Sequence, residues 1–392
     1  MSALMPTYKR LPVTFVRGEG AVLWDHKGRP FLDGLSGIAV TNLGHCHPNV
    51  TAAIQEQAAT LMHASNLFRI AQQERLAAEL SAATGMEAMF FCNSGAEANE
   101  VAIKLARRYG HEQGINVPTT VVLESAFHGR TMGALAATAG HIMKENFEPM
   151  LQGFERVPRN DIAAIEAAAS SNPNIVAVLV EPVQGEGGVR QLDVEYLRAL
   201  RALCDRKNWL LMFDEVQCGN GRSGSLYAFQ QLGVTPDVLV TAKGLGNGFP
   251  IGCCMARGDA AQVLKAGDHG TTYGGNPLGC SAGSAVINTI ASDSLCDRVA
   301  PIREHIIHGF ESALKRTDSV REIRGLGLMI GIEVNVPAGD LVRLGLEQGV
   351  VINVTAGNTI RLLPPLVMTD AQATELGQIV ADVVNNTEES TS

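Results

Sequence analysis

Two side chains of opposite charge each follow a short apolar run near the middle of the chain. The run Leu210–Phe213 leads directly into Asp214, and the run Val238–Val240 is followed closely by Lys243. Uniformly apolar runs of this length are typical of strands buried in a parallel sheet. Because ligands of open α/β sheets bind at the carboxyl ends of strands, Asp214 and Lys243 are expected to face one crevice if their strands are neighbours.

The sequence after Lys243 is crowded with glycines, at Gly244, Gly246 and Gly248. A lysine in a buried, glycine-lined site loses its proton readily and can form a Schiff base with an aldehyde. An acid such as Asp214 can hold a ring nitrogen protonated while the lysine moves a proton as a general base. The pair therefore suits a cofactor that carries both an aldehyde and a basic ring nitrogen.

A turn of small residues, Asn93–Ala96, lies between the apolar run AMFFC and a helical pattern. Small residues let the backbone approach a ligand, and the amides that open a helix form a cup for a phosphate group. The alternative is an ordinary helix start, in which Ser94 and Glu97 form a capping box. Taken alone, the turn fits both interpretations equally well.

Two further strand ends carry residues that could contact a ligand. Phe127, His128 and Arg130 follow the run TTVVL, and an aromatic ring with an arginine suits a flat ligand that bears a carboxylate. A core phenylalanine and a surface arginine are the commoner explanation for such residues in isolation. Glu181 and Glu186 follow the run IVAVLV in a glycine-rich loop, which is more acid than a turn needs.

Pyridoxal 5'-phosphate (PLP) is the cofactor whose requirements match all of these features. It needs a lysine for its aldehyde, an acid for its pyridinium nitrogen, an amide cup for its phosphate and an aromatic residue over its ring. Each feature alone has a simpler explanation, but they occur together and in a consistent order along an alternating pattern of strands and helices. The residues therefore predict a PLP enzyme.

Composition narrows the class of protein. At 392 residues, with 46% hydrophobic and 18% charged residues, the chain is long enough for one large domain and one smaller domain. The net charge of −9, without a basic block, argues against a nucleic-acid surface. No apolar run approaches the ~20 residues that span a bilayer, and the start of the chain lacks a signal-peptide core. The eight cysteines form no CxxC pair, so buried free thiols in the cytoplasm are expected.

Strand and helix patterns alternate over residues 88–256, which predicts an α/β fold with a mostly parallel central sheet flanked by helices. The glycine-rich start of the chain predicts an arm, and the last third predicts a second α/β lobe that joins this arm in a smaller domain. The expected boundaries are 1–50 for the arm, 51–277 for the large cofactor-binding domain and 278–392 for the C-terminal part of the small domain.

Two other ligand motifs are discounted. The stretch His45–Pro48 places two histidines on alternate residues, but no further metal ligand is grouped beside them in the sequence, so no metal is expected. The glycine pattern at Gly325 and Gly327 precedes a strand, and that after Lys243 leads into no helix. A dinucleotide fingerprint would follow a strand and open a helix.

Several motifs together resemble the subgroup III PLP-dependent aminotransferases. The resemblance extends from about Gly18 to Pro365 and is carried by the segments LGHCHP, HASNLF, NSGAEANEVAIKLAR, FHGRT, EPVQGEGG, DEVQCGNGRSG, AKGLGNGFPIG and HGTTYGGNPLGC. It implies the fold of the fold type I PLP-dependent transferases. It also implies a homodimer in which the two subunits share their active sites.

The resemblance assigns roles in cofactor binding motif by motif. Lys243 would carry the cofactor as a Schiff base and Asp214 would pair with its ring nitrogen. Gln217 would lie near the ring hydroxyl, and Thr272 of the neighbouring subunit would reach the phosphate. The remaining cofactor contacts implied are the helix start with Ser94, Gly95 and Ala96 and the stacking ring of Phe127.

Substrate contacts are implied in the same way. Arg130 would hold the α-carboxylate of the substrate, and Arg361 would bind a carboxylate of glutamate or 2-oxoglutarate. Glu186 would pair with Arg361 when that site is idle, and Asn66 would contact substrate from the other subunit. An arginine that can be covered or uncovered lets charge decide which of two unlike amine donors is accepted.

Within the family, the motifs are most similar to those of members acting on N-acetylornithine. This implies transfer of its terminal amino group to 2-oxoglutarate, giving N-acetylglutamate 5-semialdehyde and glutamate, a step of arginine biosynthesis. Members acting on free ornithine have a tyrosine where this chain has Ile38, which favours an acylated substrate. Succinylornithine, ornithine and succinyl-diaminopimelate are alternative donors. An aminomutase of the glutamate-semialdehyde type and a non-catalytic α/β binding protein are more distant alternatives.

Overall fold

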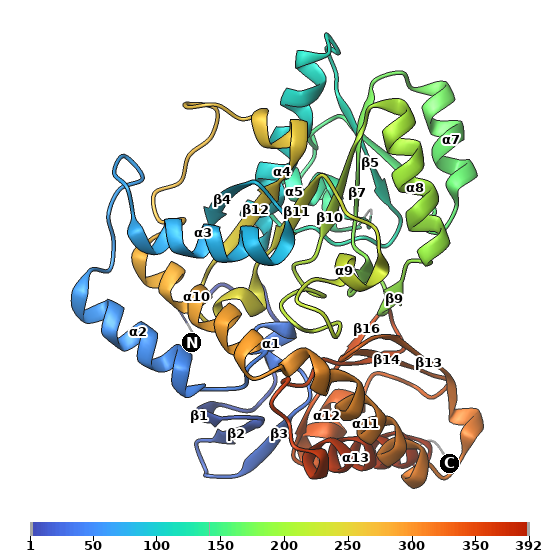
Figure 1. Cartoon of the computed structure of the whole chain (residues 1–392). Helices are drawn as coiled ribbons and strands as arrows, with labels where there is room; N and C mark the ends of the chain where they lie inside the picture. Colours follow the sequence, from blue (N-terminus) through green and yellow to red (C-terminus); the bar gives the residue numbers. More distant parts are fainter. Residues whose placement is uncertain (1–2, 141, 390–392) are drawn as a thin grey trace.

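The computed structural model describes residues 3–140 and 142–389, and a seven-stranded sheet forms its centre. Figure 1 shows this sheet in the upper part of the molecule, with helices on both of its faces. Its strands, in spatial order, are β4 (Ala88–Cys92), β12 (Gly252–Ala256), β11 (Val238–Thr241), β10 (Leu210–Asp214), β7 (Ile175–Val180), β5 (Thr119–Leu123) and β6 (Phe154–Val157).

The sheet is mostly parallel, as the alternating pattern predicted. Only β12 runs against its neighbours, since it pairs antiparallel with both β11 and β4. Strands β10 and β11 are parallel neighbours in which Asp214 lies opposite Val240. This register places the end of β10 beside the end of β11, only a few residues before Lys243. The two apolar runs therefore meet at one edge of the sheet, as expected.

Helices cover both faces of the central sheet because its strands are apolar on both sides. The longest of them, α4 (Gly95–Glu112), starts directly after β4 and buries its apolar residues against the sheet. The other helices here are α3 (Ala71–Thr84), α5 (Met132–Ala137), α6 (Ile142–Glu145), α7 (Ile162–Ser171), α8 (Val194–Lys207) and α9 (Ala228–Leu232), with 3₁₀ turns at Lys243–Gly246 and Gly258–Gln262.

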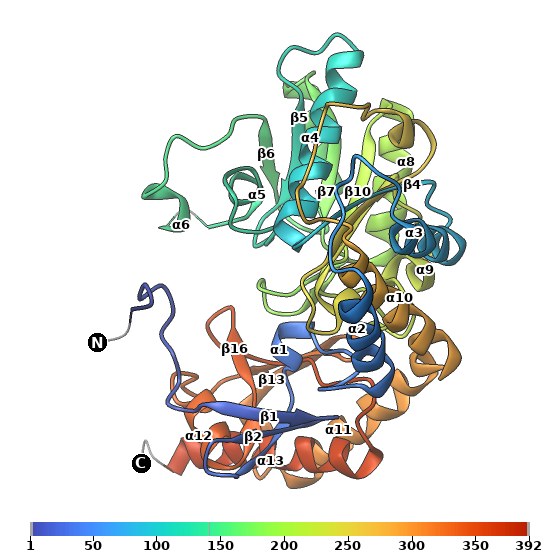
Figure 2. The same cartoon turned by 90° about the vertical axis from the view of Figure 1, so that its left-hand side faces the viewer.

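A smaller α/β domain lies below the central sheet, where the blue N-terminal strands meet the red C-terminal elements (Figures 1 and 2). One sheet joins both ends of the chain, because β15 (Val350–Val351) pairs parallel with β3 (Pro30–Asp33). Its other strands are β1 (Phe15–Glu19) and β2 (Val22–Asp25). The small domain is thus built from the arm and the C-terminal lobe, as predicted, while the boundaries at residues 50 and 277 stay predictions.

The second sheet of the small domain carries one of the predicted arginines. It consists of β13 (Val320–Leu326), β14 (Met329–Val334), β17 (Thr359–Leu362) and β16 (Asn353–Thr355). A short ribbon, β8 (Val183–Gln184) and β9 (Arg190–Gln191), leads toward it from the central sheet. The remaining elements are α1 (Ser36–Ala39), α2 (Pro48–Thr60), α10 (Pro277–Ser292), α11 (Val299–Ala313), α12 (Leu341–Glu347) and α13 (Asp370–Glu389), with 3₁₀ turns at Leu295–Arg298 and Thr317–Ser319.

A fully buried arginine, Arg222, joins the loop after β10 to the small domain. Its guanidinium donates to the carbonyls of Leu328 and Pro364 and, at 2.6 Å, to the side-chain oxygen of Asn42. Asn42 in turn donates to the carbonyl of Asn220 at 2.9 Å. Burial lowers the pKa of Arg222 to about 9, with the charge of Asp33 opposing the shift, so the guanidinium stays charged near neutral pH. The arginine therefore ties three distant segments together.

Replacing Arg222 by methionine should destabilise the protein, because the side-chain volume is kept while three buried acceptors lose their donor. The expected loss is about 2–4 kcal/mol of unfolding free energy. It would appear as a drop of several degrees in the melting temperature by calorimetry. The control is Arg343→Met, which removes an exposed arginine of α12 paired with Asp340 and Glu347 and should leave the melting temperature nearly unchanged. Equal melting of the two variants would contradict this account of Arg222.

Candidate active site

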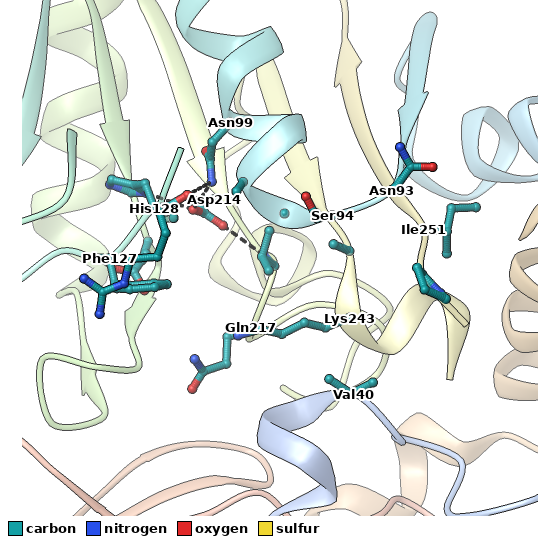
Figure 3. Close-up of a pocket in the computed structure, with 18 of the residues that line it drawn as sticks. Val40, Asn93, Ser94, Asn99, Phe127, His128, Asp214, Gln217, Lys243 and Ile251 are labelled. Atoms are coloured by element: carbon teal, nitrogen blue, oxygen red, sulfur yellow. Dashed lines mark hydrogen bonds and ion pairs between the residues drawn. The ribbon is translucent and has the colours of Figure 1, made fainter. Parts of the chain in front are cut away.

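A cavity of about 460 Å³ lies at the carboxyl ends of β10 and β11. Figure 3 shows residues from several separate segments converging on it, with Asp214 and Lys243 both in view. Its walls include eight of the residues predicted from the sequence: Ser94, Gly95, Ala96, Phe127, Arg130, Asp214, Gln217 and Lys243. Its volume and its mixture of apolar walls and a few polar groups suit a small organic ligand.

Asp214 is held in place by hydrogen bonds to both carboxylate oxygens. Oδ2 accepts from Asn99 Nδ2 at 2.7 Å and lies 2.8 Å from His128 Nδ1, while Oδ1 accepts from the amide of Val216 at 3.0 Å (Figure 3). All of this lies beneath the surface, since Asp214 is 4% exposed and His128 2% exposed. Donors fixed in this way stabilise a buried carboxylate and set the direction in which it faces.

Lys243 opens a 3₁₀ turn just after β11 and has a φ of 45°, in the left-handed region that few non-glycine residues adopt. Burial, followed by the positive charge of Arg361, lowers the pKa of its amine. The preceding Ala242 is anchored because its carbonyl accepts from Asn220 Nδ2 at 3.1 Å. A fixed lysine with a lowered pKa is a competent nucleophile and proton carrier.

The start of α4 is capped, as one interpretation of its sequence predicted, and the phosphate cup stays a prediction. Ser94 Oγ accepts from the amide of Glu97 at 3.2 Å, and Glu97 Oε2 accepts from the amide of Asn93 at 2.6 Å, so a cap is formed. This cap uses neither the amide of Gly95 nor that of Ala96, the first two of the helix. These two amides border the cavity and can still donate to an anion.

The predicted aromatic and arginine lie together on the loop after β5. The Arg130 guanidinium is 5.2 Å from the centre of the Phe127 ring, and both residues line the cavity. The amide of Phe127 donates to Glu181 Oε2 at 2.8 Å. The simpler explanation of Phe127 as a core residue is therefore wrong, since its half-buried ring borders the cavity.

Arg361 and Glu186 form an ion pair of 2.6 Å beside the cavity. Arg361 lies on β17 and is fully buried, and its guanidinium also donates to Gln217 Oε1 at 3.1 Å and to Asn353 Oδ1 at 3.2 Å. Because Gln217 borders the cavity, the ion pair is connected to it through one side chain. The sequence separates these partners by more than 100 residues, so only the fold brings them together.

Asn66 and Thr272 do not reach this cavity within one chain. Both line a separate hollow of about 800 Å³, where Asn66 Nδ2 donates to the carbonyl of Gly274 at 3.0 Å and Thr272 is exposed. Their predicted roles require a neighbouring subunit and stay predictions.

Several lining residues were given no specific role from the sequence, although His128 was among those that could contact a ligand. Asn99 and His128 hold Asp214, and Val40, Phe249 and Ile251 supply apolar wall. A buried asparagine inside an amphipathic helix was the available signal for Asn99, since such a residue needs a partner. Ile38, in contrast, packs against the main core cluster, and Val40 from the same segment lines the cavity instead.

The HCHP segment shows one contact that its sequence did not reveal. His45 Nε2 lies 2.7 Å from Asp33 Oδ2, and Asp33 also accepts from the amides of Leu35 and Ser36. Within residues 3–140 and 142–389, no three His, Cys, Asp or Glu side chains group as they would around a metal ion. Across the same residues, no helix has the length and apolar character needed to span a bilayer.

A mostly parallel sheet with an acid and a lysine at adjacent strand ends, and a helix start beside them, is the arrangement that a PLP site requires. The class-III aminotransferase family model matches residues 4–384, and the chain belongs to this family. It is 51% identical to the acetylornithine aminotransferase of Nitrosomonas europaea over 383 residues, which cover 98% of this chain and 97% of that protein.

Solved structures agree with this assignment. N-acetylornithine aminotransferase from Stenotrophomonas maltophilia matches with a TM-score of 0.86 and 34% identity, covering 98% of each chain. Ornithine aminotransferase from Toxoplasma gondii matches with a TM-score of 0.93 and 33% identity, covering 99% of this chain and 94% of that one. The predicted fold type and the dependence on PLP are therefore confirmed, and the chain is a PLP-dependent aminotransferase.

The residues present fit this cofactor. A Cβ on Gly95 would lie 2.7 Å from a methyl carbon of Val216, so the helix start and the turn after Asp214 already touch and can both border one flat ring. The amides of Gly95 and Ala96 suit the phosphate, Asp214 suits the ring nitrogen, and Lys243 suits the aldehyde. These assignments of single residues remain predictions.

Gly95→Ala should weaken PLP binding by about tenfold or more, which corresponds to about 1.4 kcal/mol. The added methyl group would displace Val216, whose amide bonds to Asp214, and would move the amides of the helix start. Equilibrium dialysis of the apo-protein against PLP measures the effect. Gly339→Ala is the control, because a Cβ there meets nothing within 4 Å. Wild-type affinity in Gly95→Ala would contradict the proposed cup.

Proposed function

We propose that this aminotransferase moves the terminal amino group of N-acetylornithine to 2-oxoglutarate, producing N-acetylglutamate 5-semialdehyde and glutamate. The observation that carries this proposal is that the two acids in the cavity wall are already hydrogen-bonded to other groups of the protein. Glu181 accepts two backbone amides and Asp214 is held by Asn99 and His128. Both carboxylates already serve other partners, Glu181 the two amides and Asp214 the position of the ring nitrogen, so neither is reserved for the α-ammonium group of ornithine. An acetylated amine carries no charge and needs no such acceptor.

PLP, when bound, supplies an aldehyde that takes up the amine and a ring that accepts electrons when a proton leaves the substrate carbon. The chain supplies the groups around it. Lys243, with its lowered pKa, would hold the aldehyde before substrate binds and would then move a proton at the substrate carbon as a general base. Asp214, fixed by Asn99, His128 and the amide of Val216, holds a proton on the ring nitrogen.

Two arginines distinguish the two substrates by charge. Arg130 is exposed at the cavity rim and would hold the α-carboxylate of acetylornithine while the terminal amine reaches Lys243. Arg361 is covered by Glu186 at 2.6 Å in this structure, which suits an amine donor that has no carboxylate beside its reacting carbon. Glutamate and 2-oxoglutarate have one there, so Glu186 must yield Arg361 to them.

Free ornithine is the second candidate donor. The support for it is the TM-score of 0.93 to the Toxoplasma gondii ornithine aminotransferase, which exceeds that to the Stenotrophomonas maltophilia acetylornithine enzyme. Sequence identity to the Nitrosomonas europaea acetylornithine enzyme, at 51%, favours the acetylated substrate instead. Val40, Phe249 and Ile251 add apolar wall that offers no acceptor to a second ammonium group.

In a panel of amines with 2-oxoglutarate, kcat/KM should be about 10- to 100-fold higher for N-acetylornithine than for ornithine. This is the range expected when an ammonium group is buried without an acceptor. Succinylornithine and succinyl-diaminopimelate complete the panel. Reactions lacking 2-oxoglutarate test for an aminomutase, which would turn over without an acceptor, and Lys243→Ala should be inactive. A higher kcat/KM for ornithine would overturn the proposed substrate.

We propose further that two copies of the chain form a homodimer with shared active sites. The loop that holds Asn66 and the segment with Thr272 border the same hollow, and His63 lies 5.6 Å from Tyr273 between ring centres. Large apolar side chains are exposed around it, with Leu67 at 89% and Phe68 at 71%. An apolar patch of this kind usually meets a partner. The scattered free thiols, mostly buried, are in keeping with a cytoplasmic location.

A shared site can be tested by complementation. Lys243→Ala and Thr272→Asp subunits should each be nearly inactive, the second because an acid would repel the phosphate. Co-expressed, they should recover about a quarter of wild-type activity, because half of the random dimers are mixed and each mixed dimer has one intact site. Leu67→Glu should yield monomers in sedimentation velocity, whereas Val117→Glu, at another exposed apolar residue, should not. Fully active monomers would contradict the shared site.

A further inference from the structure

Glu181 is a buried acid of the cavity wall to which the proposed reaction assigns no step. It follows β7 directly and is 5% exposed. Burial raises its pKa to about 7, with His128 and the two amides that it accepts opposing the rise and Asp214 adding to it. Keeping a carboxylate in such a place costs free energy, so the contacts that it makes require an explanation.

Its two oxygens bind two different loops. Oε2 accepts from the amide of Phe127 at 2.8 Å, and Oε1 accepts from the amide of Gly185 at 3.4 Å. The first amide belongs to the loop after β5 that carries Arg130. The second belongs to the loop between β8 and β9 that carries Glu186. One carboxylate therefore spans the gap between the segments that bear the two candidate carboxylate-binding groups.

Contacts on the Gly185 side continue to Arg361. A Cβ on Gly185 would lie 2.2 Å from Gln217 Oε1, so the loop presses closely against Gln217. Gln217 accepts from Arg361 at 3.1 Å, and Arg361 pairs with Glu186 at 2.6 Å. A shift of Gly185 would thus alter two of the three side-chain partners of Arg361 at once, Gln217 and Glu186.

Contacts on the Phe127 side continue to the cofactor position. The Phe127 ring lines the cavity with the Arg130 guanidinium 5.2 Å from its centre, and the next residue, His128, holds Asp214 at 2.8 Å. A shift of the Phe127 amide would therefore alter the ring that borders the cofactor and the arginine at the rim.

We propose that Glu181 is a positioning residue that fixes the distance between the Arg130 site and the Arg361–Glu186 pair by accepting one amide from each loop. This rests on the proposed function, because that distance matters only when one substrate uses both arginines. Glutamate and 2-oxoglutarate carry two carboxylates and would span both sites, whereas acetylornithine would use Arg130 alone. The bridge therefore serves the glutamate half-reaction more than the acetylornithine half-reaction.

Glu181→Gln tests the bridge without changing side-chain volume. A glutamine has one acceptor oxygen, so it can bind only one of the two amides and turns an NH₂ group toward the other. In rapid mixing of the holoenzyme, followed by cofactor absorbance, we expect the glutamate half-reaction to slow at least about tenfold more than the acetylornithine half-reaction. The visible circular dichroism of bound PLP should also change, because the Phe127 ring moves.

Glu215→Gln is the matched control. Glu215 is equally buried, burial also raises its pKa to about 7, and it also accepts two amides, those of Ala228 at 2.5 Å and Phe229 at 2.8 Å. Those amides start α9 and touch neither arginine. Its substitution should leave the ratio of the two half-reactions and the circular dichroism of PLP unchanged, whatever it does to the melting temperature.

Glu181→Asp separates position from charge. Its carboxylate keeps the charge but is one methylene too short to reach both loops, so it should behave like Glu181→Gln. An unchanged ratio of the two half-reaction rates in Glu181→Gln would overturn the proposal. A wild-type ratio in Glu181→Asp would overturn it as well. Failure of wild-type enzyme to react with acetylornithine would instead refute the proposed function, and the dichroism comparison, which needs no substrate, would still test the bridge.

Discussion

The parallel pairing of β10 with β11 is the constraint on which the site depends. Its register sets Asp214 opposite Val240, so the acid and the lysine that follows β11 leave the sheet at one edge. Both strands are buried over their whole length, which makes them rigid. The polar side chains that follow them therefore face the crevice at the carboxyl ends of the strands. The distance between an acid and an amine is thus fixed by backbone hydrogen bonds rather than by flexible loops.

Burying these charges has a cost that the surroundings must offset. Asp214 is satisfied by Asn99, His128 and a backbone amide, and Glu181 by two backbone amides. The two terminal nitrogens of Arg222 donate to two carbonyls and an asparagine oxygen. The donors and acceptors come from segments far apart in the sequence, so the site and the packing of the two domains both depend on long-range hydrogen bonds.

The features that could be predicted from the sequence are those set by local pattern. Apolar runs ending in Asp214 and Lys243 indicated buried strand ends, and Ser94 with Glu97 indicated a helix start. Features that require pairing between distant segments could not be predicted from spacing. The antiparallel course of β12 and the joining of β15 to β3 depend on tertiary packing. Asn99, which holds Asp214, could not be predicted for the same reason, because the two residues are distant in the sequence.

The resemblance to a family supplied what local pattern lacked, namely the long-range pairing of Glu186 with Arg361, and the geometry adds a physical reason for it. Arg361 is fully buried, and it lies close enough to Lys243 for the positive charge of the guanidinium to lower the pKa of the lysine. An uncovered Arg361 would depress that pKa further, and a bound carboxylate or Glu186 relieves it. Glu186 therefore acts on the pKa of Lys243 through Arg361, and under the proposed roles it would act on substrate choice as well. A substrate carboxylate that took its place on Arg361 would likewise offset the positive charge near the lysine in the glutamate half-reaction.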